Sequence, residues 1–151
     1  MAVGEATFDQ MHAVPGFRLG TTVANIKKPN RKDLVIMELA AGSTVAGTFT
    51  KNAFCAAPVL ICQQNLAQLT QPSSQKLYFI TNTGYANAGT GPQGMTNAKK
   101  VCATVAESTG VDTENVFPFS TGVIGEPLPV ARIDARIPDC VEALSEAGWE
   151  D

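Results

Sequence analysis

A hydroxyl and a glycine stand side by side in the segment 118–125, whose sequence is PFSTGVIG. A short apolar strand at 115–119 is expected to deliver Thr121 and Gly122 to a tight turn at 120–125. The Thr121 hydroxyl and the Gly122 backbone N–H would then point at one place. Two neutral donors that converge on one oxygen are what an oxyanion hole requires in acyl transfer. From the residues alone, a plain strand-to-helix turn remains the alternative.

Small and polar residues fill a second segment, 81–91, whose sequence is TNTGYANAGTG. Residues this small let one backbone approach another backbone or a ligand closely, so both a structural loop and a ligand wall fit this composition. Gly89–Gly94 also matches the G-x-G-x-x-G pattern of dinucleotide-binding loops. We reject that interpretation because seven residues, 82–88, precede Gly89 after the expected strand. In the true motif the first glycine ends the strand, and Pro92 also lacks an N–H.

The other reactive side chains of the sequence do not indicate a catalytic or metal site. Cys55 lacks a histidine that would activate it as a nucleophile, since the chain has one His, His12, in a polar stretch expected to be solvated. Lys51 is interpreted as an exposed turn lysine, and the basic segment 27–32 as a solvated loop. We expect no metal site, because zinc usually needs two or more His or Cys ligands. Any acyl-transfer mechanism therefore has to work without histidine.

The elements that must position these residues follow from periodicity. Alternating apolar and β-branched residues predict strands, and apolar residues at helical spacing predict helices. The expected strands are 17–26, 34–39, 44–50, 76–81 and 115–119, and the expected helices are 56–69, 95–109 and 132–147. The first three strands would form an antiparallel meander, and the last helix is one or two, broken at Pro138. The predicted fold class is α/β (α+β), a layered sandwich in which helices cover a mixed or antiparallel sheet.

Composition limits the class of protein. The chain has 151 residues, which we interpret as a single domain, 1–151. Its hydrophobic fraction is 44% and its charged fraction is 17%, so part of the surface is expected to be covered by something else. A net charge of −3 gives no electrostatic footprint for nucleic acid or an anionic membrane. With no signal peptide or membrane span recognised and four cysteines interpreted as reduced core thiols, we expect a cytoplasmic protein.

Three segments, taken in order, resemble one family: the ornithine acetyltransferases, or glutamate N-acetyltransferases, the ArgJ family of arginine biosynthesis. They are 45–59 (VAGTFTKNAFCAAPV), 82–91 (NTGYANAGTG) and 118–125 (PFSTGVIG). The resemblance runs from about Gly16 to Asp151. It departs at Tyr85, where the family is expected to carry a small polar residue. The resemblance implies a fold of the ArgJ/DmpA type.

The resemblance also implies a precursor that cleaves itself into α and β chains, assembled as an α2β2 heterotetramer. The nucleophile would be the new N-terminal threonine of the β chain, with its own α-amine as base. It implies acetyl transfer from N2-acetylornithine to glutamate through an acetyl-threonine, without a cofactor, and with acetyl-CoA as a further substrate of some members. Thr121 and Gly122 match the family's oxyanion-hole pair. We interpret this chain as the N-terminal part of an α subunit, in which no nucleophile or substrate-binding residue is assigned.

Two alternatives to this function stay open. One is a non-catalytic binding or assembly module with a ligand loop at 82–91. The other is an N-terminal-nucleophile amidohydrolase, which would share the oxyanion chemistry but pass the acyl group to water.

Overall fold

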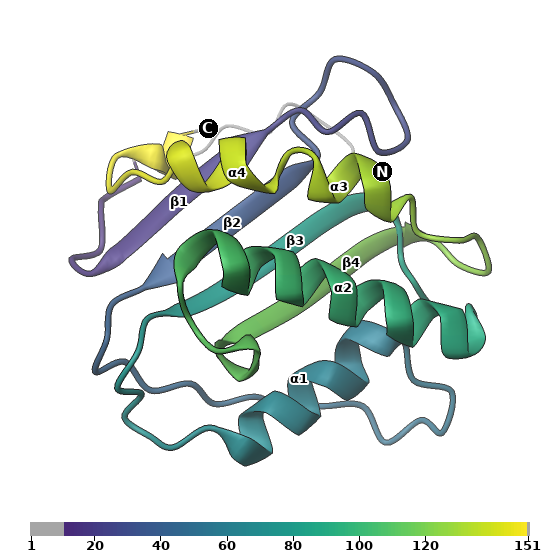
Figure 1. Cartoon of the computed structure of the whole chain (residues 1–151), viewed down its shortest axis with the longest axis horizontal. Helices are drawn as coiled ribbons and strands as arrows, with labels where there is room; N and C mark the ends of the chain where they lie inside the picture. The colour runs from purple at the N-terminus through teal and green to yellow at the C-terminus, as the bar shows by residue number, and fades with distance from the viewer. Residues whose placement is uncertain (1–10, 151) are drawn as a thin grey trace.

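The architecture rests on one four-stranded sheet, in the spatial order β1-β2-β3-β4 (Figure 1). A computed structural model describes residues 11–150 of the chain. The strands are β1 (Phe17–Thr22), β2 (Leu34–Leu39), β3 (Leu77–Tyr85) and β4 (Val116–Val123). The first three are mutually antiparallel, and β4 is parallel to β3. The predicted mixed sheet with covering helices is therefore confirmed.

Helices lie mainly on one side of this sheet. They are α1 (Ala57–Gln68), α2 (Gly91–Thr109), α3 (Val130–Asp134) and α4 (Ile137–Glu142), with 3-10 turns at Thr113–Asn115 and Gly148–Glu150. Helix α2 supplies the crossover that two parallel strands need. Figure 1 shows α2, α3 and α4 across one face and α1 beside β4. No helix in the described part of the chain is both long and apolar enough to cross a bilayer.

The main core lies between the sheet and these helices. Leu34, Ile36 and Ile80 point toward the helical layer and are at most 2% exposed. They pack with helix residues that include Val105 and Ile137, both fully buried. Strand side chains alternate between the two faces of the sheet, so every second strand residue points into this core.

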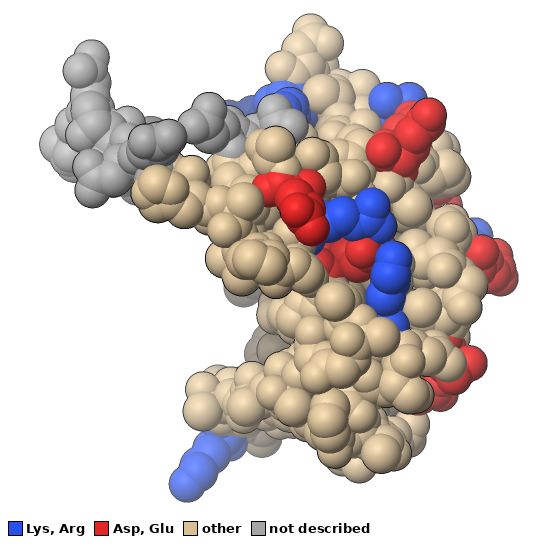
Figure 2. All heavy atoms as spheres, turned by 90° about the vertical axis from the view of Figure 1, so that its left-hand side faces the viewer, with Lys and Arg blue, Asp and Glu red and all other residues tan. Residues whose placement is uncertain are grey.

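The opposite face of the sheet has helical cover only at its β4 edge, where Cys62 and Leu66 of α1 belong to one apolar cluster with Phe117. Strand register places Met37, Phe79 and Phe117 together on it, followed by Phe119, which is 45% exposed. In the side view of Figure 2 the molecule is hollowed on this side, and most of the visible surface around the hollow is uncharged. An exposed apolar face of this kind is typical of a surface that binds another molecule, and the low charge content had predicted that something else covers part of the surface.

The predicted strand at 44–50 is wrong. This segment has no regular secondary structure and lies mostly exposed along the rim of the uncovered face. The backbone N–H of Val45 donates to the Gln71 side chain at 2.7 Å instead of to a strand. Alternation of side-chain types at every second residue leads to a strand only where a partner strand is available. No described strand pairs with this segment.

Other element ends moved for local reasons. Strand β1 stops at Thr22 because the Asp33 carboxylate accepts the backbone N–H groups of Ala24 and Ile26. Strands β3 and β4 run to 85 and 123, past the predicted 81 and 119, because they pair with each other there. Helix α2 begins four residues before the predicted start, at Gly91, with Pro92 in its first turn. The last predicted helix is two short ones, but the break lies at residues 135–136 and not at Pro138, which is in the first turn of α4. After α4, Ser145 pairs with β1.

Candidate functional site

The carboxyl ends of β3 and β4 lie side by side. In the register, Thr83 faces Thr121 and Gly84 faces Gly122, so the same dipeptide occurs at the same level of two neighbouring parallel strands. Ligands of α/β proteins commonly bind beyond the carboxyl ends of parallel strands. Thr121 and Gly122 are therefore located where a site is expected, although they belong to the strand and not to the predicted tight turn at 120–125.

The two glycines allow the strand ends to approach each other. Gly122 has φ +133° and Gly84 has φ +110°, conformations that L side chains rarely adopt. A Cβ on Gly122 would overlap the backbone carbonyl of Gly84. Glycine at both positions is thus a requirement of the local backbone.

The amide of Gly122 points away from β3. The Ala86 N–H donates to the Val123 carbonyl oxygen at 2.9 Å, which makes Val123 a residue that bonds to the neighbouring strand. Alternate residues of a parallel strand bond to the same neighbour, so the N–H of Gly122 faces the free edge of β4. Pro118 lies four residues before Gly122, so its backbone nitrogen also faces the free edge. A proline is tolerated there because no strand needs a hydrogen bond from that nitrogen.

Helix α1 covers this edge only in part. Asn65 donates to the Val116 carbonyl oxygen at 2.7 Å, and Cys62 Sγ to that of Pro118 at 3.2 Å. The helix starts at Ala57, and the residues beyond Ser120 on β4 are exposed. The Gly122 amide therefore lies past the protected part of the edge.

The Thr121 hydroxyl lies on the uncovered face. Thr121 lies two residues after Phe119 and four after Phe117 in β4, so its side chain points to the same face as theirs, and the residue is exposed. No described residue makes a hydrogen bond to the hydroxyl. An exposed, uncommitted hydroxyl and an outward amide on consecutive residues are two neutral donors that a bound oxyanion can use.

A buried amide joins the two strands behind these donors. Asn82, 4% exposed, accepts a hydrogen bond from Ser120 Oγ at 2.6 Å. Its amide nitrogen donates to the Tyr85 carbonyl oxygen at 2.9 Å. Both ends of the Asn82 side chain are satisfied, so the residues preceding Thr83 and Thr121 are fixed relative to each other.

The loop that follows β3 has a structural anchor. Asn87 is fully buried, donates to the Gly94 carbonyl oxygen at 2.9 Å and accepts from Thr90 Oγ1 at 2.8 Å. Its own carbonyl oxygen accepts the N–H of Ala57 at the start of α1. The small residues of this segment thus let the loop join the first turns of two helices, which favours the structural interpretation over the ligand wall.

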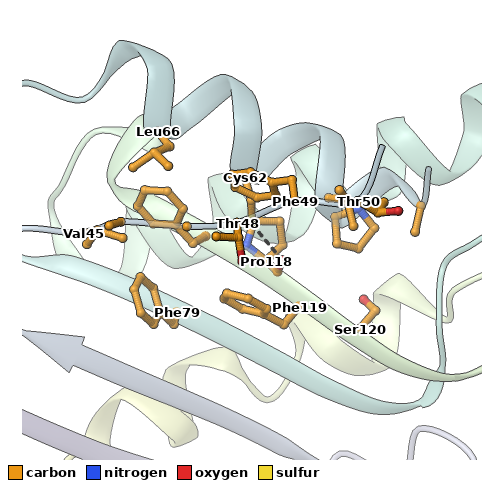
Figure 3. A pocket seen from close by; sticks show the side chains of 16 residues that line it. Val45, Thr48, Phe49, Thr50, Cys62, Leu66, Phe79, Pro118, Phe119 and Ser120 are labelled. Atoms are coloured by element: carbon orange, nitrogen blue, oxygen red, sulfur yellow. Dashed lines mark hydrogen bonds between the residues drawn. The ribbon is translucent and has the colours of Figure 1, made fainter. Parts of the chain in front are cut away.

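An apolar pocket opens on the uncovered face next to this strand end. Its volume is about 460 Å³, and it lies between the segment 45–50, helix α1 and strands β3 and β4. Figure 3 shows Phe49, Phe79 and Phe119 around it, with Ser120 at one end. The Phe79 and Phe119 rings meet edge to face, 5.7 Å apart. The pocket brings apolar surface close to the Thr121 donor.

The other side chains considered in the sequence analysis, Lys51, His12 and Cys55, are not part of this site. Lys51 and His12 are exposed, as predicted. Cys55 is only half-buried, so its interpretation as a core thiol is wrong, and its Sγ donates to the Asn52 carbonyl oxygen at 2.9 Å. The described residues include no group of three or more His, Cys, Asp or Glu placed to hold a metal ion.

The other cysteines are unreactive thiols. All three are buried and unpaired. Burial raises the pKa of Cys62 to about 11 and the pKa values of Cys102 and Cys140 to about 12. A thiol with so high a pKa is neutral at physiological pH and a poor nucleophile.

The sequence analysis missed how three residues contribute to this site. Gly84, Asn82 and Ser120 position the Thr121–Gly122 pair, whereas the first two were placed in a structural loop or ligand wall and Ser120 in a tight turn. The repeated Thr-Gly dipeptide after two strands was a usable signal. It identifies neighbours only once β3 and β4 are known to pair in parallel.

Sequence comparisons give consistent matches. The model of the ArgJ family matches residues 18–150. An arginine biosynthesis bifunctional protein ArgJ of Pseudomonas fluorescens is 49% identical over 150 residues, which are 99% of this chain and 36% of that protein. The ArgJ protein of Pseudomonas syringae pv. tomato is 49% identical over 149 residues, 99% of this chain and 35% of that protein. The chain thus spans about a third of the length of these curated relatives.

Solved structures share the fold. An ornithine acetyltransferase from Mycobacterium tuberculosis, in complex with ornithine, superposes with a TM-score of 0.79 and 32% identity, over 88% of this chain and 69% of that one. The arginine biosynthesis bifunctional protein ArgJ of Bacillus halodurans gives a TM-score of 0.71 and 34% identity, over 82% of this chain and 62% of that one.

Proposed function

The chain belongs to the ArgJ family, and from that premise we propose that it is the N-terminal part of the α chain of an acetyltransferase of arginine biosynthesis. The enzyme would move the acetyl group of N2-acetylornithine to glutamate. One observation carries the assignment of roles: the exposed Thr121 hydroxyl lies beside the outward-facing Gly122 amide at the carboxyl ends of two parallel strands. The ornithine in the crystal structure of the Mycobacterium tuberculosis relative supports the substrate class.

The chemistry proposed for these donors is oxyanion stabilisation. A threonine hydroxyl on the β chain attacks the acetyl carbonyl carbon, and its proton passes to the α-amine of the same threonine. Thr121 and Gly122 donate to the resulting oxyanion, which develops only as the carbonyl becomes tetrahedral. Collapse breaks the C–N bond, and the ornithine amine leaves with that proton. The glutamate amine then attacks the acetyl-threonine through the same intermediate geometry, and the threonine hydroxyl is regenerated.

The rest of the enzyme would complete the site and cover the apolar face. The chain spans about a third of the length of its curated relatives, and its sheet presents Phe119 at 45% exposure on the face opposite α2, α3 and α4. A β chain packed there would bring its N-terminal threonine near Thr121 and assemble as an α2β2 heterotetramer. The proposed location is the cytoplasm, which the buried unpaired cysteines support.

The test uses the full-length protein. Denaturing mass spectrometry is expected to find two polypeptides, of which the second begins with threonine. Incubation with N2-acetylornithine and glutamate should yield equimolar ornithine and N-acetylglutamate. Release of acetate in place of N-acetylglutamate would assign the amidohydrolase alternative. An uncleaved protein without turnover would contradict the enzyme and favour the binding module.

A further inference from the structure

Thr83 of β3 presents a second hydroxyl next to the proposed oxyanion pair. It is the register partner of Thr121 in the parallel pairing of β3 and β4. Thr83 lies four residues after Phe79, and Thr121 lies two residues after Phe119, so both side chains point to the face that carries the apolar pocket. Neighbouring strands are about 4.8 Å apart, which puts the two hydroxyls within hydrogen-bonding reach of the same small group.

The Thr83 hydroxyl is uncommitted, unlike the other polar side chains beside it. The backbone N–H of Thr83 donates to the Asp33 carbonyl oxygen at 2.9 Å, which holds the residue in the strand. Ser120 Oγ donates to Asn82 at 2.6 Å, and Asn82 donates in turn to a backbone carbonyl oxygen. Thr83 is half-buried, and within residues 11–150 its hydroxyl has no hydrogen-bond partner. This hydroxyl is therefore available to a bound molecule without loss of an internal contact.

Space for a bound molecule lies next to Thr83 on the side away from β4. Thr83 lines a cavity of about 110 Å³ together with Asp33 and side chains of the basic turn 27–32, which connects β1 and β2. On the opposite side of the oxyanion pair, at the free edge of β4, α1 and the segment 45–50 border the apolar pocket. An acetyl donor whose carbonyl oxygen is held by the oxyanion pair thus has room for its larger group past Thr83.

We infer that the Thr83 hydroxyl accepts a hydrogen bond from the amine nitrogen of the acetyl donor, while Thr121 and Gly122 hold the carbonyl oxygen of the same amide. The oxygen and the nitrogen of an amide are bonded to one carbon atom. An oxygen bound at β4 therefore leaves the nitrogen over β3 when the larger group extends toward the cavity. The inference rests on the proposed function, because it adds a substrate contact to the same acyl-transfer site.

This contact would act on the nitrogen as the carbonyl carbon becomes tetrahedral. In the intermediate the nitrogen has one N–H and a lone pair. A threonine hydroxyl can accept the N–H, which leaves the lone pair free for the proton carried by the α-amine of the attacking threonine. Protonation of the lone pair lets the C–N bond break, and Thr83 itself transfers no proton. The glutamate amine, which attacks the acetyl-threonine through the same geometry, would make the same contact.

Two acetyl donors that differ only at this nitrogen test the contact in the full-length enzyme. One is N2-acetylornithine, and the other is its thioester analogue, 2-(acetylthio)-5-aminopentanoate, in which sulfur replaces the N–H. The sulfur donates no hydrogen bond and is a weak acceptor. In Thr83→Val, which keeps the β-branched shape, kcat/KM for N2-acetylornithine is expected to fall about tenfold through loss of one hydrogen bond. The value for the thioester should not change.

Three further variants separate the contact from the fold. Thr81→Val removes a hydroxyl from the same strand and the same face, beside Phe119, and should leave kcat/KM unchanged for both donors. Thr83→Ser keeps the acceptor and should retain most of the activity with N2-acetylornithine. Thr83→Ala removes the same hydroxyl together with the methyl group, and it should repeat the selective loss.

A loss confined to N2-acetylornithine in both Thr83→Val and Thr83→Ala supports the inference. Unchanged values for both donors overturn it. Equal losses with both donors also overturn it and would assign Thr83 to the support of Thr121 in the strand pair. Failure of the proposed function is seen separately, because the wild type would then transfer no acetyl group from N2-acetylornithine to glutamate.

Discussion

Thr121 and Gly122 would contribute different kinds of donor. The Gly122 amide belongs to the backbone, and its direction is set by the strand register. The Thr121 hydroxyl belongs to an exposed side chain. A substitution can therefore remove this hydroxyl without altering the strand, whereas no substitution removes the Gly122 amide alone. At the scale of the residue, Thr121 is therefore the position where the proposed oxyanion role can be separated from folding.

Replacing Thr121 by valine keeps the shape and β-branching but removes the hydroxyl. In the full-length enzyme we expect kcat to fall about 10²-fold with little change in KM, the usual cost of one oxyanion donor. Steady-state rates with N2-acetylornithine and glutamate measure the effect. Thr21→Val, on the same sheet face in β1, should retain the wild-type kcat, and Thr121→Ser should retain much of it. An unchanged kcat in Thr121→Val would refute the oxyanion assignment.

At the scale of the element, a buried charge joins the first three strands. Glu38 of β2, 5% exposed, accepts two hydrogen bonds from Arg18 of β1 at 2.7 and 2.6 Å and one from Tyr78 of β3 at 2.7 Å. Lys76 Nζ lies 3.2 Å from the same carboxylate. Burial raises the pKa of Glu38, but the hydrogen bonds from these three partners outweigh burial, so its pKa lies below the usual 4.5.

A lowered pKa in the folded state makes the network sensitive to acid. Its contribution to stability is complete above the unfolded pKa and is lost as pH falls through the folded value. Glu38→Gln should lower the free energy of unfolding by about 1–3 kcal/mol at neutral pH. It should also flatten the decline of stability below about pH 4.5. Urea unfolding at several pH values tests this, with the exposed Glu142→Gln as control. Equal pH dependence in Glu38→Gln and wild type would rule out this role.

At the scale of the whole molecule, one face of the sheet is packed against helices α2, α3 and α4, and the opposite face is largely exposed. Helices bury the first, whereas Phe119 and the apolar pocket lie on the second. We expect the 151-residue chain on its own to bind the dye 8-anilinonaphthalene-1-sulfonate more strongly than the full-length protein does. Phe119→Ser should weaken the fluorescence of the isolated chain. Equal dye binding by the isolated chain and the full-length protein would show that nothing covers this face.

Local patterns in the sequence were sufficient for several elements. Helix α1 was predicted from apolar residues at helical spacing, and β2 from alternation, because both patterns report which side of a single element is buried. The strand expected at 76–81 is β3, an internal strand of the sheet. The motifs of 45–59, 82–91 and 118–125 indicated the family, which the comparisons confirmed.

Only the tertiary structure decided which of these elements meet. The segment 44–50 has the pattern of a strand but no partner strand, and β4 extends to Val123 because β3 pairs with it. The same pairing puts Gly84 beside Gly122, 38 positions away in the chain, with the basic turn 27–32 on its other side. Strand pairing depends on backbone groups that are the same in every residue, so the side-chain sequence indicates that a strand forms but not which strand lies next to it.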